Sequence, residues 1–114
     1  MDDLIAFLNA RLGEDEAAAN SLFFAARIPD KRPDFTACGG PAAEVYWDHF
    51  NPARVLREVA AKRAILAEYE RVAGSAQAYP NNATITSLGA AQTVVKALGT
   101  VYSDHPDYRG EWAP

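Results

Sequence analysis

Three stretches of the chain carry apolar residues at intervals of three or four positions, the spacing of one face of an α-helix. In residues 2–26 these are Leu4, Ile5, Leu8, Leu12, Ala19, Leu22 and Phe23. In residues 52–73 they are Leu56, Val59, Ile65, Leu66, Tyr69 and Val72. In residues 83–98 they are Ile85, Leu88, Ala91, Val94, Val95 and Leu98. The pattern predicts a mainly α fold with three helices.

The second stretch has the clearest start signal. Asn51 can accept hydrogen bonds from the first free backbone donors, and Pro52 suits the first helical position. Phe50 and Val55 then have the spacing of a hydrophobic staple. Gly74 is expected to end this helix in a left-handed conformation.

The segment between the first two predicted helices is irregular in pattern. Residues 29–43 are rich in Pro, Gly and Asp, which predicts a loop, with a short strand or hairpin around residues 35–38 as the alternative. Residues 42–50 are expected to form one or two helical turns that direct Val45, Tyr46 and Phe50 toward the core.

Charged residues interrupt the apolar stripes of the first two helices near their middles. If these helices pack antiparallel, Asp15 or Glu16 would meet Lys62 or Arg63, and we expect an ion pair there. Solvated faces are the alternative. Such a pair more often selects helix register than performs chemistry.

Composition narrows the function classes. The 114 residues suit a single domain over residues 1–114, and the net charge of −4 disfavours binding to nucleic acid or to an anionic membrane. A DNA-binding helix-turn-helix regulator is also disfavoured, because this chain has no strongly basic helix that could serve as the recognition helix.

Cys38 is the only cysteine, so no disulfide forms within the chain. With no basic leader and no apolar run of about 18 residues, we expect a cytoplasmic protein without a membrane span.

The C-terminal stretch SDHPDYRGEWAP concentrates polar and aromatic residues. Pro106 favours a turn over residues 105–108, which Asp104 can cap. Tyr108 and Trp112 are then free to fold back as an aromatic tail against the helices. The stretch is thus predicted to close the fold.

The same stretch allows an alternative, a metal-dependent hydrolase or nuclease in which the ion activates water. Its candidate ligands are Asp48, His49, Asp104, His105 and Asp107. Neither histidine occurs in an HxxxH or HExxH arrangement, so local spacing does not support this alternative. The glycines form no nucleotide-binding loop, and we expect no cofactor.

The favoured hypothesis is a small non-enzymatic module that binds a protein partner or a second copy of itself. Partly exposed aromatic residues commonly anchor such interfaces. The candidates are Tyr46, Trp47, Tyr108 and Trp112.

Three segments together resemble a known family: MDDLIAFLNARLGEDE, NPARVLREVAAKRAIL and YSDHPDYRGEWAP. They are similar to small actinobacterial and actinophage proteins classed as a domain of unknown function, with an acidic N-terminal helix, a D/N-PARVL helix and a DHPDYxxEW tail. Residues 20–44 and 75–99 lack family landmarks. The resemblance implies that the tail is recurrent, but it names no activity. An accessory or regulatory role in a phage or prophage is part of the favoured hypothesis.

Overall fold

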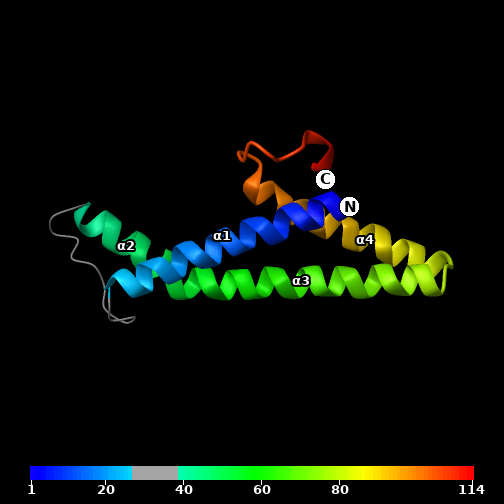
Figure 1. The fold of residues 1–114 in the computed structure, drawn as a ribbon, viewed down its shortest axis with the longest axis horizontal. Helices are drawn as coiled ribbons and strands as arrows, with labels where there is room; N and C mark the ends of the chain where they lie inside the picture. Colours follow the sequence, from blue (N-terminus) through cyan, green and yellow to red (C-terminus); the bar gives the residue numbers. More distant parts are fainter. Residues whose placement is uncertain (27–38) are drawn as a thin grey trace. The chain divides into compact units, whose positions relative to one another are not determined.

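The computed structural model describes residues 1–26 and 39–114, with side chains described for 1–21 and 39–114 (Figure 1). Its helices are α1 (Asp2–Ala26), α2 (Gly40–Phe50), α3 (Pro52–Ala78) and α4 (Asn82–Gly99), followed by the 3-10 turns η1 (Thr100–Tyr102) and η2 (Gly110–Trp112). No strand occurs in the described ranges, which confirms the mainly α prediction. The strand or hairpin predicted around residues 35–38 lies outside them.

The chain divides into two compact units. The first unit comprises Met1–Leu12 and Ala61–Pro114, and the second comprises Gly13–Ala60. Helices α1 and α3 therefore each contribute to both units. The single domain expected over residues 1–114 stays a prediction.

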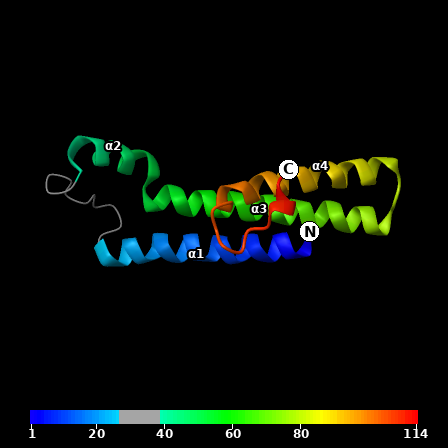
Figure 2. The same cartoon turned by 90° about the horizontal axis from the view of Figure 1, so that it is seen from above.

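The first unit is built on a helical hairpin, in which α4 runs back along the end of α3 (Figure 2). The start of α1 supplies Leu4, Phe7, Leu8 and Leu12 to its core, with exposed fractions of 0%, 8%, 1% and 1%. The other buried apolar residues of this unit are Leu66, Tyr69, Ala76, Val95 and Trp112. The core thus joins segments from both ends of the chain.

Helix α4 begins with a capping box that the sequence analysis did not identify. The Asn81 side chain accepts from the Thr84 backbone N–H at 3.0 Å, and the Thr84 hydroxyl accepts from the Asn81 backbone N–H at 3.0 Å. Two of the free donors of the first turn are thereby satisfied. The helix begins one residue before the predicted start.

The predicted start of α3 is confirmed. The Asn51 side chain accepts from the Arg54 backbone N–H at 3.0 Å, as expected of a cap followed by a proline. The predicted end at Gly74 is wrong, because α3 continues to Ala78. Among the described glycines only Gly39 and Gly40 have positive φ, at 81° and 54°, and they lie at the start of α2 instead, as its N-cap and its first residue.

Helix α2 corrects a second prediction. It is a continuous helix of 11 residues with no buried residue, rather than one or two turns directed toward the core. Val45 is 58% exposed, Tyr46 66% and Phe50 49%. The apolar spacing within a short helix does not distinguish a face that contacts the core from one that contacts solvent.

Candidate functional site

The C-terminal segment closes the first unit, as the sequence predicted. The Tyr108 backbone N–H donates to the His105 carbonyl at 2.9 Å, which forms the turn expected over residues 105–108. Beyond this turn the chain passes over the start of α1 (Figure 1). The turn therefore brings the aromatic residues of the tail to the N-terminal helix.

Phe7 is the centre of the resulting aromatic cluster. Its ring centroid lies 5.1 Å from that of Trp112, 6.1 Å from that of Tyr108 and 5.5 Å from that of His105. Tyr108 and Trp112 also contact each other edge to face at 5.7 Å. Edge-to-face pairs add about 0.5–1.5 kcal/mol beyond the burial of their area. The cluster is a packed part of the core.

His105 is held by two hydrogen-bond donors. Arg11 Nη1 contacts both ring nitrogens of His105, Nε2 and Nδ1, with 2.9 Å to Nδ1, and the Asp107 backbone N–H donates to Nδ1 at 3.0 Å. Both ring nitrogens of His105 therefore have contacts within the protein. The Asp107 carboxylate lies 4.0 Å from Arg11 Nη1. This polar group ties the turn to α1.

Farther along the C-terminal segment, Arg109 forms an ion pair with the start of α1. Arg109 pairs with Asp3 at 3.0 Å, and its guanidinium lies 5.3 Å from the centre of the Trp112 ring. Both groups of the ion pair are more than half exposed, so the pair itself contributes little, about 0–1 kcal/mol. It orients the segment beside the cluster.

The candidate metal ligands fall on different units. Asp48 and His49 are on α2 in the second unit, whereas Asp104, His105 and Asp107 belong to the first. Among the described residues, no three His, Cys, Asp or Glu side chains form a group that could hold a metal ion. Cys38 lies outside the described range.

The expected pair of Asp15 or Glu16 with Lys62 or Arg63 would join residues of the two units and stays a prediction. Lys62 contacts the Tyr102 ring within the first unit, with its Nζ 5.6 Å from the ring centre. This cation–π contact places Lys62 beside the C-terminal segment.

In the second unit, Tyr46 and Phe50 are on the surface. Tyr46 and Phe50 stack with ring centroids 4.9 Å apart and an interplanar angle of 26°. Together with Val45 they form what we call the α2 aromatic face. Its three side chains are each about half exposed or more.

Arg54 fixes one edge of the α2 aromatic face. Its guanidinium lies 4.5 Å from the centre of the Phe50 ring, donates to the His49 carbonyl at 2.7 Å and pairs with Glu58 at 3.0 Å. These contacts connect the end of α2 to the first turns of α3. The ring of Phe50 is therefore held in place although it is exposed.

A small cavity adjoins the same edge. It has a volume of about 190 Å³ and is lined by Asp15, Ala18, Ala19, Phe50, Pro52 and Val55. The predicted staple residues Phe50 and Val55 thus border one space. The cavity is smaller than a typical drug-sized ligand site, and it fits a single inserted side chain better.

The four aromatic residues predicted for interaction are divided between the two units. Tyr46 is exposed and Trp47 half-buried on α2, whereas Tyr108 is half-buried and Trp112 only 7% exposed in the cluster of the first unit. Trp112 is therefore a core residue. Phe50 takes a place on the exposed face that sequence reasoning missed, because the same i, i+4 spacing also suits a buried stripe.

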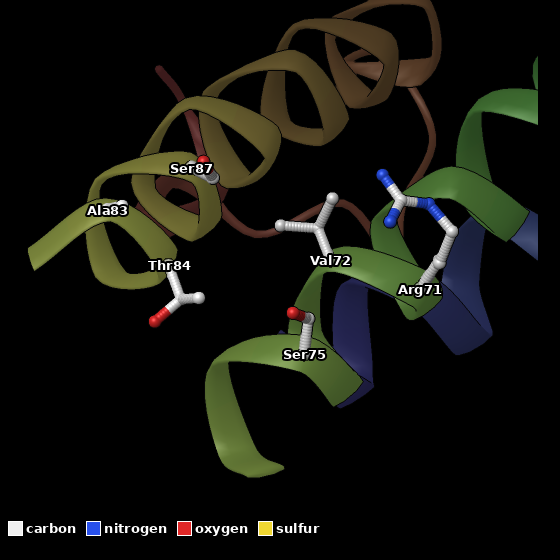
Figure 3. A pocket seen from close by; sticks show the side chains of 6 residues that line it. All are labelled: Arg71, Val72, Ser75, Ala83, Thr84 and Ser87. Carbon is white, nitrogen blue, oxygen red and sulfur yellow. The ribbon is translucent and has the colours of Figure 1, made fainter. Parts of the chain in front are cut away.

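A second cavity lies between the end of α3 and the start of α4 (Figure 3). It has a volume of about 180 Å³ and is lined by Arg71, Val72, Ser75, Ala83, Thr84 and Ser87. The guanidinium of Arg71 also donates two hydrogen bonds to the Glu68 carboxylate, at 2.9 and 2.6 Å. The hydrogen bond from Arg71 lowers the pKa of the Glu68 carboxyl.

The part of the chain that the structure describes contains no helix that is long and apolar enough to cross a membrane. The chain belongs to the family of unknown function DUF6221, whose model matches residues 1–114. Comparisons with curated proteins and with solved structures give no match.

Proposed function

We propose that this member of the DUF6221 family is a non-enzymatic helical module that binds another protein through the α2 aromatic face. The observation that carries the proposal is the exposure of Val45, Tyr46 and Phe50 on a helix that has no buried residue. Exposed aromatic and aliphatic residues that lie together commonly mark interaction sites.

The geometry of the face supports a binding role in two further ways. The Tyr46 and Phe50 rings are stacked and Phe50 is held by Arg54, so less side-chain entropy is lost on binding. The cavity beside Phe50 can accept one apolar side chain of a partner. Aromatic anchors next to a pocket are typical of the centre of an interface.

Trp47 borders this face and is included in the proposed contact. Tyr108 and Trp112 are not, since their packing in the first unit already accounts for them. A role as an accessory protein of a phage or prophage is part of the proposal, and the sequence resemblance supports it.

Photo-crosslinking in cells that naturally express the protein tests the proposal. A photoreactive phenylalanine analogue is placed at Tyr46, which is 66% exposed, and at Tyr79, a control residue that is 73% exposed. We expect a discrete product with one protein at position 46, which disappears when Phe50→Ser is added. Equal product patterns at both positions would contradict the proposal, and a product between two copies of the chain would identify the partner as a second copy.

A further inference from the structure

One side of α4, continued into the 3-10 turn η1, carries a second exposed surface, which we call the α4 seam. Its residues are all exposed and recur at alternating intervals of four and three: Ala83, Ser87, Ala90, Val94, Ala97 and Val101. Val94 is 48% exposed and Val101 59%. The intervening Leu88, Val95 and Gly99 face the unit's own interior or are half-buried. Such spacing is that of the contact stripe between two paired helices.

The charge distribution of the chain indicates what can cover this seam. Helix α4 contains no Asp or Glu and only one charged residue, Lys96, whereas the whole chain has a net charge of −4. Helices α1, α2 and α3 all carry acidic residues. Two copies of an acidic protein repel each other least where acidic residues are absent, and the seam offers no charge to attract a charged partner.

We propose that the α4 seam pairs with the α4 seam of a second copy of this chain, antiparallel about a two-fold axis. In such an interface the same surface serves both copies, so each contact occurs twice. Val101 of one copy then comes opposite Ala83 of the other, and Val94 comes opposite Ala90. Alanine at alternate seam positions lets the two helices approach closely, because the separation of packed helices depends on the size of the side chains between them.

The cavity between α3 and α4 strengthens this assignment. It opens beside Ala83 and Ser87, at the start of the seam, and Val72 forms an apolar part of its lining (Figure 3). In the antiparallel pair, this is where Val101 of the second copy arrives. The rest of the lining is mostly polar, so the contact that the cavity offers Val101 is the one with Val72. A cavity at one end of the seam and an exposed apolar side chain at the other fit the pairing of this surface with itself.

Sedimentation across a concentration series from micromolar to millimolar tests the pairing. We expect the chain to form dimers, and Val94→Asp or Val101→Asp to raise the dissociation constant by at least about tenfold, since carboxylates would enter an apolar contact. Ile85→Asp is the matched control: Ile85 is 59% exposed, like Val101, but lies on another side of α4. It should leave the dissociation constant unchanged. Circular dichroism checks that each variant stays helical.

Monomers at every concentration, or equal weakening by Ile85→Asp and Val101→Asp, would overturn the proposal. Phe50→Ser, on the α2 aromatic face, should leave the dimer intact, so this inference and the proposed function can fail separately. If Phe50→Ser abolishes the dimer while Val94→Asp does not, the pairing runs through α2 and the α4 assignment is wrong.

Disulfide trapping in a Cys38→Ser background tests the orientation. Thr93→Cys would lie near the two-fold axis and should give a covalent dimer on oxidation, whereas Ala83→Cys alone should not, because the antiparallel arrangement separates the two Ala83 positions by the length of the seam. Cross-linking of both variants would indicate a parallel pair and overturn the antiparallel arrangement.

Discussion

The two units of the chain use aromatic residues in opposite ways. In the first unit, Phe7 and Trp112 come from opposite ends of the chain and bury each other, with 8% and 7% of their surfaces exposed. In the second, Tyr46 and Phe50 are neighbours on one helix and stack on the surface, with 66% and 49% exposed. In these two clusters, long-range contact buries the rings in a core, whereas local contact within one helix leaves them exposed.

The largest expected difference between the units is in stability. Trp112→Ala should lower the free energy of unfolding by about 3–5 kcal/mol, because it removes a buried ring and leaves a cavity. Tyr46→Ala should change it by no more than about 0.5 kcal/mol, as is usual for an exposed position. Urea unfolding followed by circular dichroism measures both values. Similar losses for the two variants would contradict the comparison.

The contribution of a helix cap to stability should differ less between the two units than the contribution of the aromatic residues. Asn51→Ala in the second unit and Asn81→Ala in the first each remove a side-chain acceptor from a helix start, and each should cost about 1 kcal/mol. The capping-box variant Thr84→Val tests whether the reciprocal bond adds to the Asn81 contribution. Caps are local, so a much larger loss at one site would show that the cap also holds tertiary contacts.

Gly74 and Gly99, both in the first unit, allow the same Gly→Ala change to be compared at an open position and at a packed one. An added Cβ at Gly74 meets nothing within 4 Å, so Gly74→Ala should stabilise the protein by about 0.5–1 kcal/mol through helix propensity. At Gly99 the Cβ would lie 3.2 Å from a methyl carbon of Leu4, so Gly99→Ala should lose most or all of that gain. Thermal unfolding of both variants gives the comparison, and equal gains would mean that the Leu4 contact is loose.

The smallest expected effect concerns alkaline pH. Burial raises the pKa of the Tyr69 hydroxyl, so the folded state disfavours its phenolate. The resulting contribution to stability is complete below the unfolded pKa of about 10 and is lost as the pH rises through the higher folded value. Between about pH 9 and pH 11, the free energy of unfolding should therefore fall less in Tyr69→Phe than in the natural chain. Identical slopes in urea unfolding at these pH values would exclude a role for Tyr69.

Much of the helical fold follows from local sequence. The periodic apolar residues and the Asn51–Pro52 signal located α1 and α3, and the Pro106 turn predicted the closure of the tail. The signals are local because a helix and its caps are specified by residues within a few positions of one another. Gly74 failed as a stop because a glycine ends a helix only when the backbone adopts positive φ there.

The candidate site was less accessible to sequence reasoning. Phe7 was not recognised as the partner of the tail, since that contact joins residues about one hundred positions apart. Phe50 was assigned to the core because the burial of a short helix depends on what packs against it, which its own spacing does not encode. Tyr46 was a candidate for interaction from its residue type alone, and its role stays a prediction.

A double-mutant cycle between Phe7 and Trp112 tests most directly the claim that the ends of the chain close one core. Phe7→Leu and Trp112→Leu keep apolar bulk, and urea unfolding of both single variants and the double variant gives the coupling energy. The ring contact at 5.1 Å predicts a favourable coupling of about 0.5–1.5 kcal/mol. If the losses in the free energy of unfolding of the two single variants add strictly in the double variant, the two rings do not stabilise each other. The claim that the ends of the chain close one core would then be contradicted.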